Sequence, residues 1–126
     1  MNLTVRDPAR SAEWYAELFG MTPLYDHDPG DGRPTYSCLV DPATGFVLCL
    51  VGHADNPGDA FHEQQTGLDH LEFLVDERSD LDEWAARLDE LGIEHSGVKQ
   101  PAHTRNAMLT FRDPDNIQLE FFWRAR

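Results

Sequence analysis

The feature that most constrains the fold of this chain is an internal repeat with a separation of 72 residues. Helix-capping residues, helix-ending glycines and Asp-Pro turns all recur at this separation. Three kinds of punctuation with one offset indicate that the same supersecondary unit occurs twice. The matched pairs are Asp7 with Ser79, Gly20 with Gly92, and Asp41 with Asp113.

Each repeat reads as a short strand, a helix and three further strands. In the first repeat, Pro8 at the first helical position and apolar residues spaced four apart, such as Trp14 and Leu18, predict a helix that Gly20 ends. The second repeat has the same kind of apolar stripe before Gly92. The expected strands are residues 3–5, 21–25, 35–40 and 46–51, then 67–75, 93–97, 107–111 and 117–123.

The composition of the segment between the repeats indicates how the chain is divided into modules. Residues 52–66 are polar and punctuated by Pro and Gly, and we interpret them as a linker between modules 1–51 and 67–126 of a single domain, 1–126. Neither module alone has enough apolar residues for a stable core. Together they can bury one sheet face under the helices and leave the other, curved face open.

The charge of the chain excludes two classes of partner. The formal net charge is −13, whereas nucleic acids and anionic membrane surfaces require a basic face. No apolar run approaches the roughly 20 residues that a membrane-spanning helix needs. The acidic excess is interpreted mainly as a solvated surface, although it would also suit a cationic ligand.

Cys38 and Cys49 each lie inside an apolar run. We expect two buried, reduced thiols in a cytoplasmic protein, since no signal peptide precedes the first strand. A Cys38–Cys49 bridge across a hairpin remains an alternative.

Three motifs resemble one known superfamily. They are Leu-Thr-Val-Arg-Asp-Pro and the helix that follows it, Gly-Leu-Asp-His-Leu-Glu-Phe-Leu-Val at 67–75, and Phe-Arg-Asp-Pro-Asp-Asn-Ile-Gln-Leu-Glu-Phe-Phe at 111–122. With the paired modules, they resemble the vicinal oxygen chelate group, which includes glyoxalase I, extradiol dioxygenases, fosfomycin-resistance enzymes and bleomycin-binding proteins. The resemblance implies an α+β fold in which two tandem βαβββ modules form one cupped, mostly antiparallel eight-stranded sheet with the helices outside. It also implies a homodimer that binds a small molecule.

The resemblance further implies a divalent metal on the open face of the sheet, held by four strand positions, two in each half. The second-half pair is present as His70, which opens its strand, and Glu120 in the last strand. Imidazole and carboxylate suit Fe(II), Mn(II), Ni(II) or Zn(II). Glu120 is also the candidate catalytic residue.

The first-half pair departs from the pattern of the resemblance. The position that corresponds to His70 falls just upstream of Met1. The counterpart of Glu120 is Leu48 at the plain offset, or Cys49 if the preceding turn is one residue longer. His53 and Cys49 are the remaining candidates for a third ligand. A native start upstream, with a histidine there, is a further hypothesis.

Residues with large side chains on the expected strands are candidates for a substrate-binding wall. Because strand side chains alternate between two faces, half of these residues should point to the open face. The runs are apolar on both faces, so the sequence leaves open which half that is. The candidates are Tyr36, Phe73, Met108, Phe111 and Trp123.

The resemblance implies three alternative functions. The first is a metal-dependent lyase or dioxygenase of the glyoxalase type that acts on a small molecule with an incomplete metal site. The second is a metal-free binding protein for a bleomycin-type antibiotic. The third is a degenerate, non-catalytic member of the superfamily.

Overall fold

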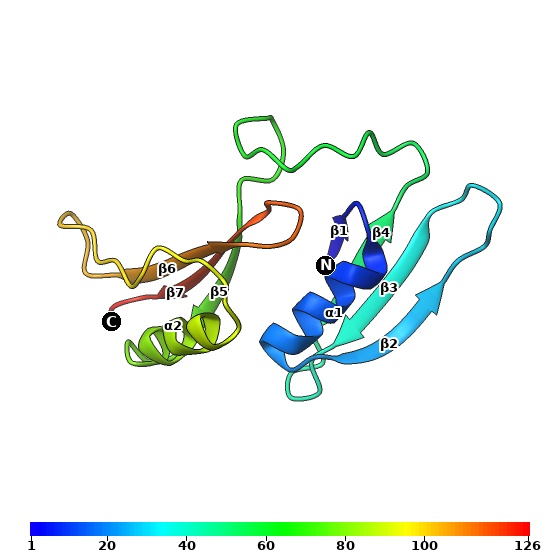
Figure 1. Cartoon of the computed structure of the whole chain (residues 1–126). Helices are drawn as coiled ribbons and strands as arrows, with labels where there is room; N and C mark the ends of the chain where they lie inside the picture. The colour runs from blue at the N-terminus through cyan, green and yellow to red at the C-terminus, as the bar shows by residue number, and fades with distance from the viewer. The chain divides into compact units, whose positions relative to one another are not determined.

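The computed structural model describes residues 1–126 and separates them into two units, Met1–Ala60 and Phe61–Arg126 (Figure 1). The boundary falls inside the predicted linker. Residues at the end of this segment already belong to the second unit, because the N–H of Phe61 donates to the carbonyl of Asp115 at 2.8 Å. No helix of the chain has the length and apolar character needed to cross a membrane.

The first unit is a four-stranded sheet with one helix packed against it (Figure 1). The strand order is β1-β4-β3-β2, with β1 parallel to β4 and the other neighbours antiparallel. Its elements are β1 (Asn2–Thr4), α1 (Pro8–Phe19), β2 (Thr22–His27), β3 (Thr35–Val40) and β4 (Val47–Gly52).

Helix α1 begins and ends where its sequence predicts. The side chain of Asp7 accepts a hydrogen bond from the N–H of Arg10 at 3.1 Å, and Pro8 occupies the first turn. Gly20 ends the helix in the left-handed conformation, with φ 67°. Tyr15 and Leu18 of α1 are fully buried and belong to the core of this unit.

The second unit repeats this plan with a three-stranded sheet. The strand order is β5-β7-β6, with β5 parallel to β7 and β6 antiparallel to β7. The ring of Trp84 stacks on Phe121 of the last strand with centroids 4.2 Å apart, which fixes the helix on that face. The elements are β5 (Leu71–Val75), α2 (Asp80–Glu90), β6 (Ala107–Arg112) and β7 (Gln118–Trp123).

The predicted α+β fold of open sheets with two helices is confirmed, but its detail of one eight-stranded sheet differs from the structure, which has seven strands in two sheets. The missing strand is 93–97, which makes only an isolated bridge between His95 and Phe111. The N–H of Gly97 donates to Nδ1 of His95, and Gly97 has φ 69°. This turned backbone interrupts the extended conformation that a ladder of hydrogen bonds requires.

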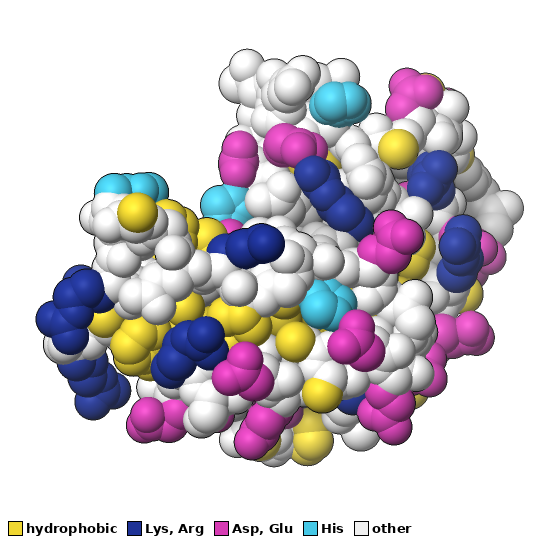
Figure 2. All heavy atoms as spheres, turned by 60° about the vertical axis from the view of Figure 1, so that its left-hand side comes forward, with side chains coloured by type: hydrophobic (Ala, Val, Ile, Leu, Met, Phe, Trp, Pro, Cys, Tyr) yellow, Lys and Arg dark blue, Asp and Glu magenta, His cyan; other side chains and the backbone are white.

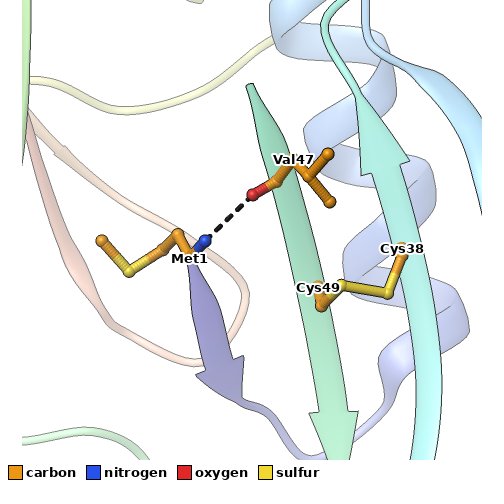
Figure 3. The surroundings of a disulfide bond; sticks show 4 residues. All are labelled: Met1, Cys38, Val47 and Cys49. Carbon is orange, nitrogen blue, oxygen red and sulfur yellow. Dashed lines mark hydrogen bonds between the residues drawn. A yellow bond between two sulfur atoms is a disulfide. The ribbon is translucent and has the colours of Figure 1, made fainter. Parts of the chain in front are cut away.

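The expectation of two reduced thiols is also wrong for this structure. Cys38 and Cys49 form a disulfide between neighbouring strands, with their Cα atoms 4.0 Å apart (Figure 3). The two residues face each other directly in the register of β3 and β4. The apolar runs concealed this register, so the bridge that the sequence left as an alternative is the observed state.

Candidate metal centre

The face of the second sheet that carries Glu120 is set by strand alternation. Leu119 and Phe121 are fully buried, and Phe121 contacts Trp84 of α2. Side chains alternate along a strand, so Glu120 points to the opposite face. Glu120 is nevertheless only 8% exposed, which is unusual for a carboxylate.

Strand β5 and the residue just before it bring two more polar side chains to this face. Glu72 lies directly beside Glu120 in the parallel register of β5 and β7. His70 precedes Glu72 by two residues and therefore shares its face. One ligand atom from each of the three residues can be chosen so that all three lie within 4.8 Å of one another.

The carboxylate of Glu120 lacks a hydrogen-bond donor. Burial is the main cause that raises its pKa, and the negative charge of Glu72 adds to this effect, whereas His70 lowers it. No polar side-chain atom is fully buried without a partner, so the oxygens of Glu120 still reach solvent at the mouth of this face. A largely buried carboxylate with no donor from the protein is stabilised by a cation or a proton. This carboxylate therefore has the character of a cation ligand.

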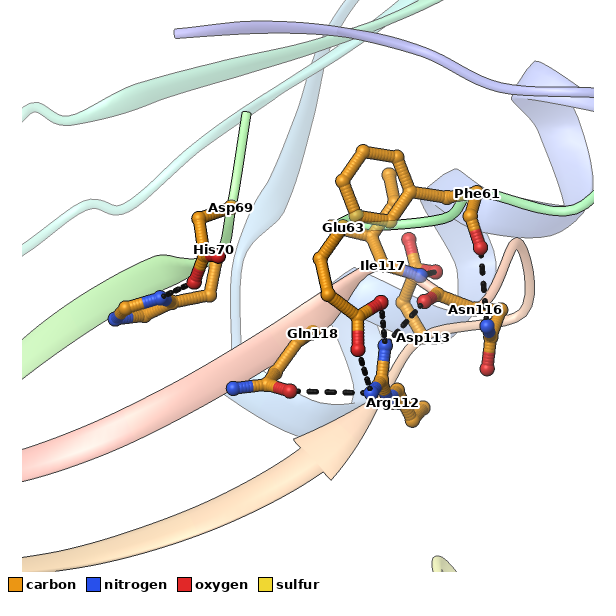
Figure 4. A network of polar contacts seen from close by, with 9 residues as sticks. All are labelled: Phe61, Glu63, Asp69, His70, Arg112, Asp113, Asn116, Ile117 and Gln118. Carbon is orange, nitrogen blue, oxygen red and sulfur yellow. Dashed lines mark hydrogen bonds and ion pairs between the residues drawn. The ribbon is translucent and has the colours of Figure 1, made fainter. Parts of the chain in front are cut away.

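The ring of His70 is held by its neighbour Asp69. Nδ1 lies 2.5 Å from Oδ1 of Asp69 (Figure 4), and this hydrogen bond is the main cause that raises the pKa of His70. Glu120 and Glu72 raise this pKa further by their charge. With Nδ1 occupied, Nε2 is left for a ligand. A carboxylate that orients a histidine in this way is the usual outer-shell arrangement of metal-binding histidines.

These residues fit a divalent transition metal. One imidazole nitrogen and two carboxylates form a mixed nitrogen and oxygen donor set that suits Mn(II), Fe(II), Ni(II) or Zn(II). Two carboxylates with a neutral imidazole also match the charge of a divalent ion. Three protein ligands would leave coordination positions for a substrate.

A second polar cluster lies on the same face. Strand alternation and the register of β6 and β7 place Arg112 and Gln118 beside the Thr110–Glu120 pair. Arg112 donates two hydrogen bonds to Glu63, at 2.9 and 2.7 Å, and one to the side-chain oxygen of Gln118 at 3.1 Å (Figure 4). The paired guanidinium lowers the pKa of Glu63 to about 2.

The first unit has a different chemistry at the position that corresponds to Glu120. Its turn closes with a hydrogen bond from the N–H of Asp41 to the carbonyl of Phe46, whereas the second turn joins Asp113 to Ile117. The first turn is therefore one residue longer. This extra residue makes Cys49, and not Leu48, the counterpart of Glu120.

The predicted third ligands are not part of the cluster. Cys49 is bonded to Cys38, so its sulfur is not a thiolate ligand in this structure. His53 lies after β4 in the first unit and is exposed. The third member is Glu72, which the sequence analysis missed. The signal was available, because residues two apart on a strand share a face and His70 was already a candidate.

The predicted substrate-binding residues separate into different environments. The rings of Phe73 and Phe111 contact Phe121, on the face that α2 covers. Met108 shares the face of Glu120. Trp123 lies two residues after Phe121 and therefore points to the same face as Phe121, which α2 covers. Tyr36 lines a cavity of about 590 Å³ in the first unit, formed by α1, β2 and β3.

The fold agrees with comparisons to known proteins. A sequence profile of the Glyoxalase/Bleomycin resistance protein/Dioxygenase superfamily matches residues 1–121. The chain belongs to this superfamily. No curated protein matches the sequence significantly.

Solved structures of the superfamily are similar over nearly the whole chain. A glyoxylase/bleomycin resistance protein/dioxygenase domain from Frankia sp. EAN1pec is 34% identical, with a TM-score of 0.84 over 99% of this chain and 94% of that chain. A glyoxalase family protein from Enterococcus faecalis is 23% identical, with a TM-score of 0.80 over 97% and 93%. The fosfomycin resistance protein FosX from Listeria monocytogenes, crystallised with Mn(II) and sulfate, is 20% identical, with a TM-score of 0.68 over 98% and 88%.

Proposed function

We propose that this superfamily member acts on a small molecule at the Glu120 face of the second unit, with a divalent metal bound by His70 and Glu120. The observation that carries the proposal is the carboxylate of Glu120, which is buried, has no hydrogen-bond donor and lies beside His70. A bound metal would act as a Lewis acid that polarises neighbouring oxygens of the substrate. Substrates with two adjacent oxygens fit this chemistry.

The residues of the chain have distinct roles in this proposal. Asp69 would hold the ring of His70 through Nδ1 and leave Nε2 for the metal. Glu120 is the carboxylate on this face that would take the proton that the substrate loses. Met108 supplies apolar surface on the same face.

Metal retention by the purified protein tests the proposal. The chain is incubated with Mn(II), Fe(II), Ni(II) or Zn(II), desalted, and measured by elemental analysis. We expect about one retained ion per chain, because one cluster of this kind is present. His70→Ala should lose the ion, and His103→Ala, at an exposed loop position, is the matched control. Equal retention by both variants would contradict the proposal.

A metal-free binding protein is the second candidate function. The observation that favours it is the disulfide at Cys49, which leaves the first unit without a carboxylate at the counterpart of Glu120. In this case the same face would bind a cationic antibiotic of the bleomycin type. Titration of metal-free protein with bleomycin at low salt tests this function, and binding that survives His70→Ala would favour it over the metalloprotein.

We also propose that the protein is a homodimer. Strand β2 is an edge strand that is exposed along its whole length, and its residues Leu24 and Tyr25 are exposed large hydrophobics. Open edges with apolar side chains favour association. Sedimentation analysis should give a dimer, and Leu24→Glu should shift it towards the monomer.

A further inference from the structure

We infer that the carboxylate of Glu72 is the third protein ligand of this metal, so that the second unit completes the site by itself. The inference rests on the proposed function and replaces the idea that the first unit must supply a ligand. It assigns a role to a residue on β5 that has no counterpart in a pattern of two ligands per unit.

The backbone places Glu72 where a ligand is needed. Its register partner across the parallel β5–β7 pair is Glu120, and His70 lies two residues before it on the same face. Partners that face each other on neighbouring strands have side chains in direct reach. The mutual separations within 4.8 Å let one ion contact all three side chains after small rotamer changes.

The charges on this face favour a cation. Glu72 and Glu120 are like charges placed directly opposite each other, an arrangement that destabilises a sheet. One of them is buried and lacks a donor, and Asp69 adds a third carboxylate within the same short segment. No lysine or arginine contacts the carboxylate of Glu120. A divalent ion between Glu72 and Glu120 would compensate both charges.

The two carboxylates differ in a way that suits a working site. Glu120 is buried and anchored on a strand with neighbours on both sides, whereas Glu72 is exposed and lies on an edge strand. Glu120 would hold the ion in a fixed position. Because Glu72 is exposed, a substrate could approach the ion from the side of Glu72. The nitrogen of His70 completes a set of three.

The disulfide in the first unit supports a site within one unit. Cys49 stands where the repeat would place a second carboxylate, and its sulfur is already bonded. Its neighbour across the parallel β1–β4 pair is Asn2, where β5 has Glu72. The first sheet thus has no acidic pair at these positions.

Calorimetric titration of the metal-free full chain with MnCl₂ tests the inference. Glu72→Gln keeps the shape and removes the charge, and we expect it to weaken Mn(II) binding at least about tenfold. Glu94→Gln, at an exposed loop position without a recorded partner, is the matched control and should bind like the wild type. Glu72→His should retain more binding than Glu72→Gln, because imidazole is also a ligand. Circular dichroism establishes that each variant is folded.

The outcomes separate the inference from the proposed function. If His70→Ala loses the ion and Glu72→Gln binds like the wild type, Glu72 is not a ligand and the proposed function stands. If the double variant Cys38→Ser with Cys49→Ser weakens binding, the first unit contributes to the site and the inference is wrong. If the wild type binds no Mn(II), Fe(II), Ni(II) or Zn(II), both proposals are wrong.

Discussion

The two units use one framework for two different purposes. Strands β3 and β4 of the first unit correspond to β6 and β7 of the second. At the same position of these pairs, Cys38 faces Cys49 in the first unit and Thr110 faces Glu120 in the second. The first pair is closed by a covalent bond, whereas the second presents a carboxylate that needs a partner. The comparison teaches that a repeated fold does not repeat its chemistry.

A difference of one residue in a turn decides which side chains are compared. The Asp41 turn is longer than the Asp113 turn, which shifts the separation from 72 residues on β3 and β6 to 71 on β4 and β7. In both turns the aspartate side chain binds backbone N–H groups, those of Ala43 in the first and of Asp115 and Ile117 in the second. The hydrogen bonds of the turn aspartate are thus kept, while the separation between corresponding residues changes by one.

Many of the acidic side chains lie on the solvent-exposed surface, outside the cluster of His70, Glu72 and Glu120. Figure 2 shows Asp and Glu side chains at many separate points of one face, in contact with solvent. The net charge of −13 is therefore consistent with a solvated surface. The cluster on β5 and β7 is distinguished by the burial of Glu120, not by the number of acids.

The largest expected effect is on the core that the second unit uses to position its site. Phe121 stacks on both Trp84 and Phe111 and is 1% exposed. Phe121→Ala should lower the free energy of unfolding by about 3–5 kcal/mol, because it leaves a cavity beneath Glu120. Denaturant titration measures this loss. A change below about 1 kcal/mol would show that this aromatic stack is not the core of the unit.

The next effect tests the covalent bond of the first unit. The double variant Cys38→Ser with Cys49→Ser should lose about 2–4 kcal/mol of stability under oxidising conditions, since the bond links residues 11 apart in sequence. In the presence of a strong thiol reductant, wild type and variant should unfold at similar denaturant concentrations. Metal retention should be the same in both, which sharpens the contrast between the units.

Glu120→Gln should have opposite effects with and without metal. In metal-free protein, removal of a buried charge without a donor should raise the free energy of unfolding by about 1 kcal/mol. In the presence of saturating Mn(II), the variant should be less stable than the wild type, because the wild type gains binding energy. Thermal melts at two metal concentrations measure both signs. A loss of stability in both conditions would mean that Glu120 has a favourable partner within the protein.

The smallest effect concerns the segment that begins the second unit. Arg112 lowers the pKa of Glu63 from its model-compound value of 4.5 to about 2. A carboxyl whose pKa is lower in the folded state contributes stability above the unfolded pKa and loses it as the pH falls. The attachment of residues 61–66 should therefore weaken between about pH 4.5 and pH 2.

Hydrogen exchange of the Phe61 N–H, expressed as a protection factor relative to the intrinsic rate at each pH, follows the attachment. Glu63→Gln should show a low protection factor at all pH values, whereas Asp59→Asn in the first unit is the control. A protection factor that is independent of pH in the wild type would contradict the role of the Glu63–Arg112 pair.

Much of the fold could be predicted because local chemistry marks it. Pro8 and Gly20 bracket α1, and the 72-residue separation of Gly20 and Gly92 revealed the repeat. The strand at 93–97 was overpredicted, because nothing in its composition shows that His95 binds Asp89 and Gly97. A side chain that captures its own backbone competes with strand pairing.

The candidate site was predicted in part. His70 and Glu120 stood out by their places in the repeat, but Glu72 was overlooked because a charged residue on an edge strand usually faces solvent. The disulfide was not favoured, since pairing of Cys38 with Cys49 depends on a register that apolar residues on both faces conceal. Both the missed ligand and the disfavoured disulfide depend on which residues face each other across strands.

The most direct test of the account is the number of Mn(II) ions retained by two full-length variants after desalting. One variant removes the disulfide of the first unit, with Cys38→Ser and Cys49→Ser, and the other removes the carboxylate beside Glu120, with Glu72→Gln. The account predicts about one ion per chain in the first variant and clearly less in the second. Loss of the ion in the first variant, with full retention in the second, would contradict it.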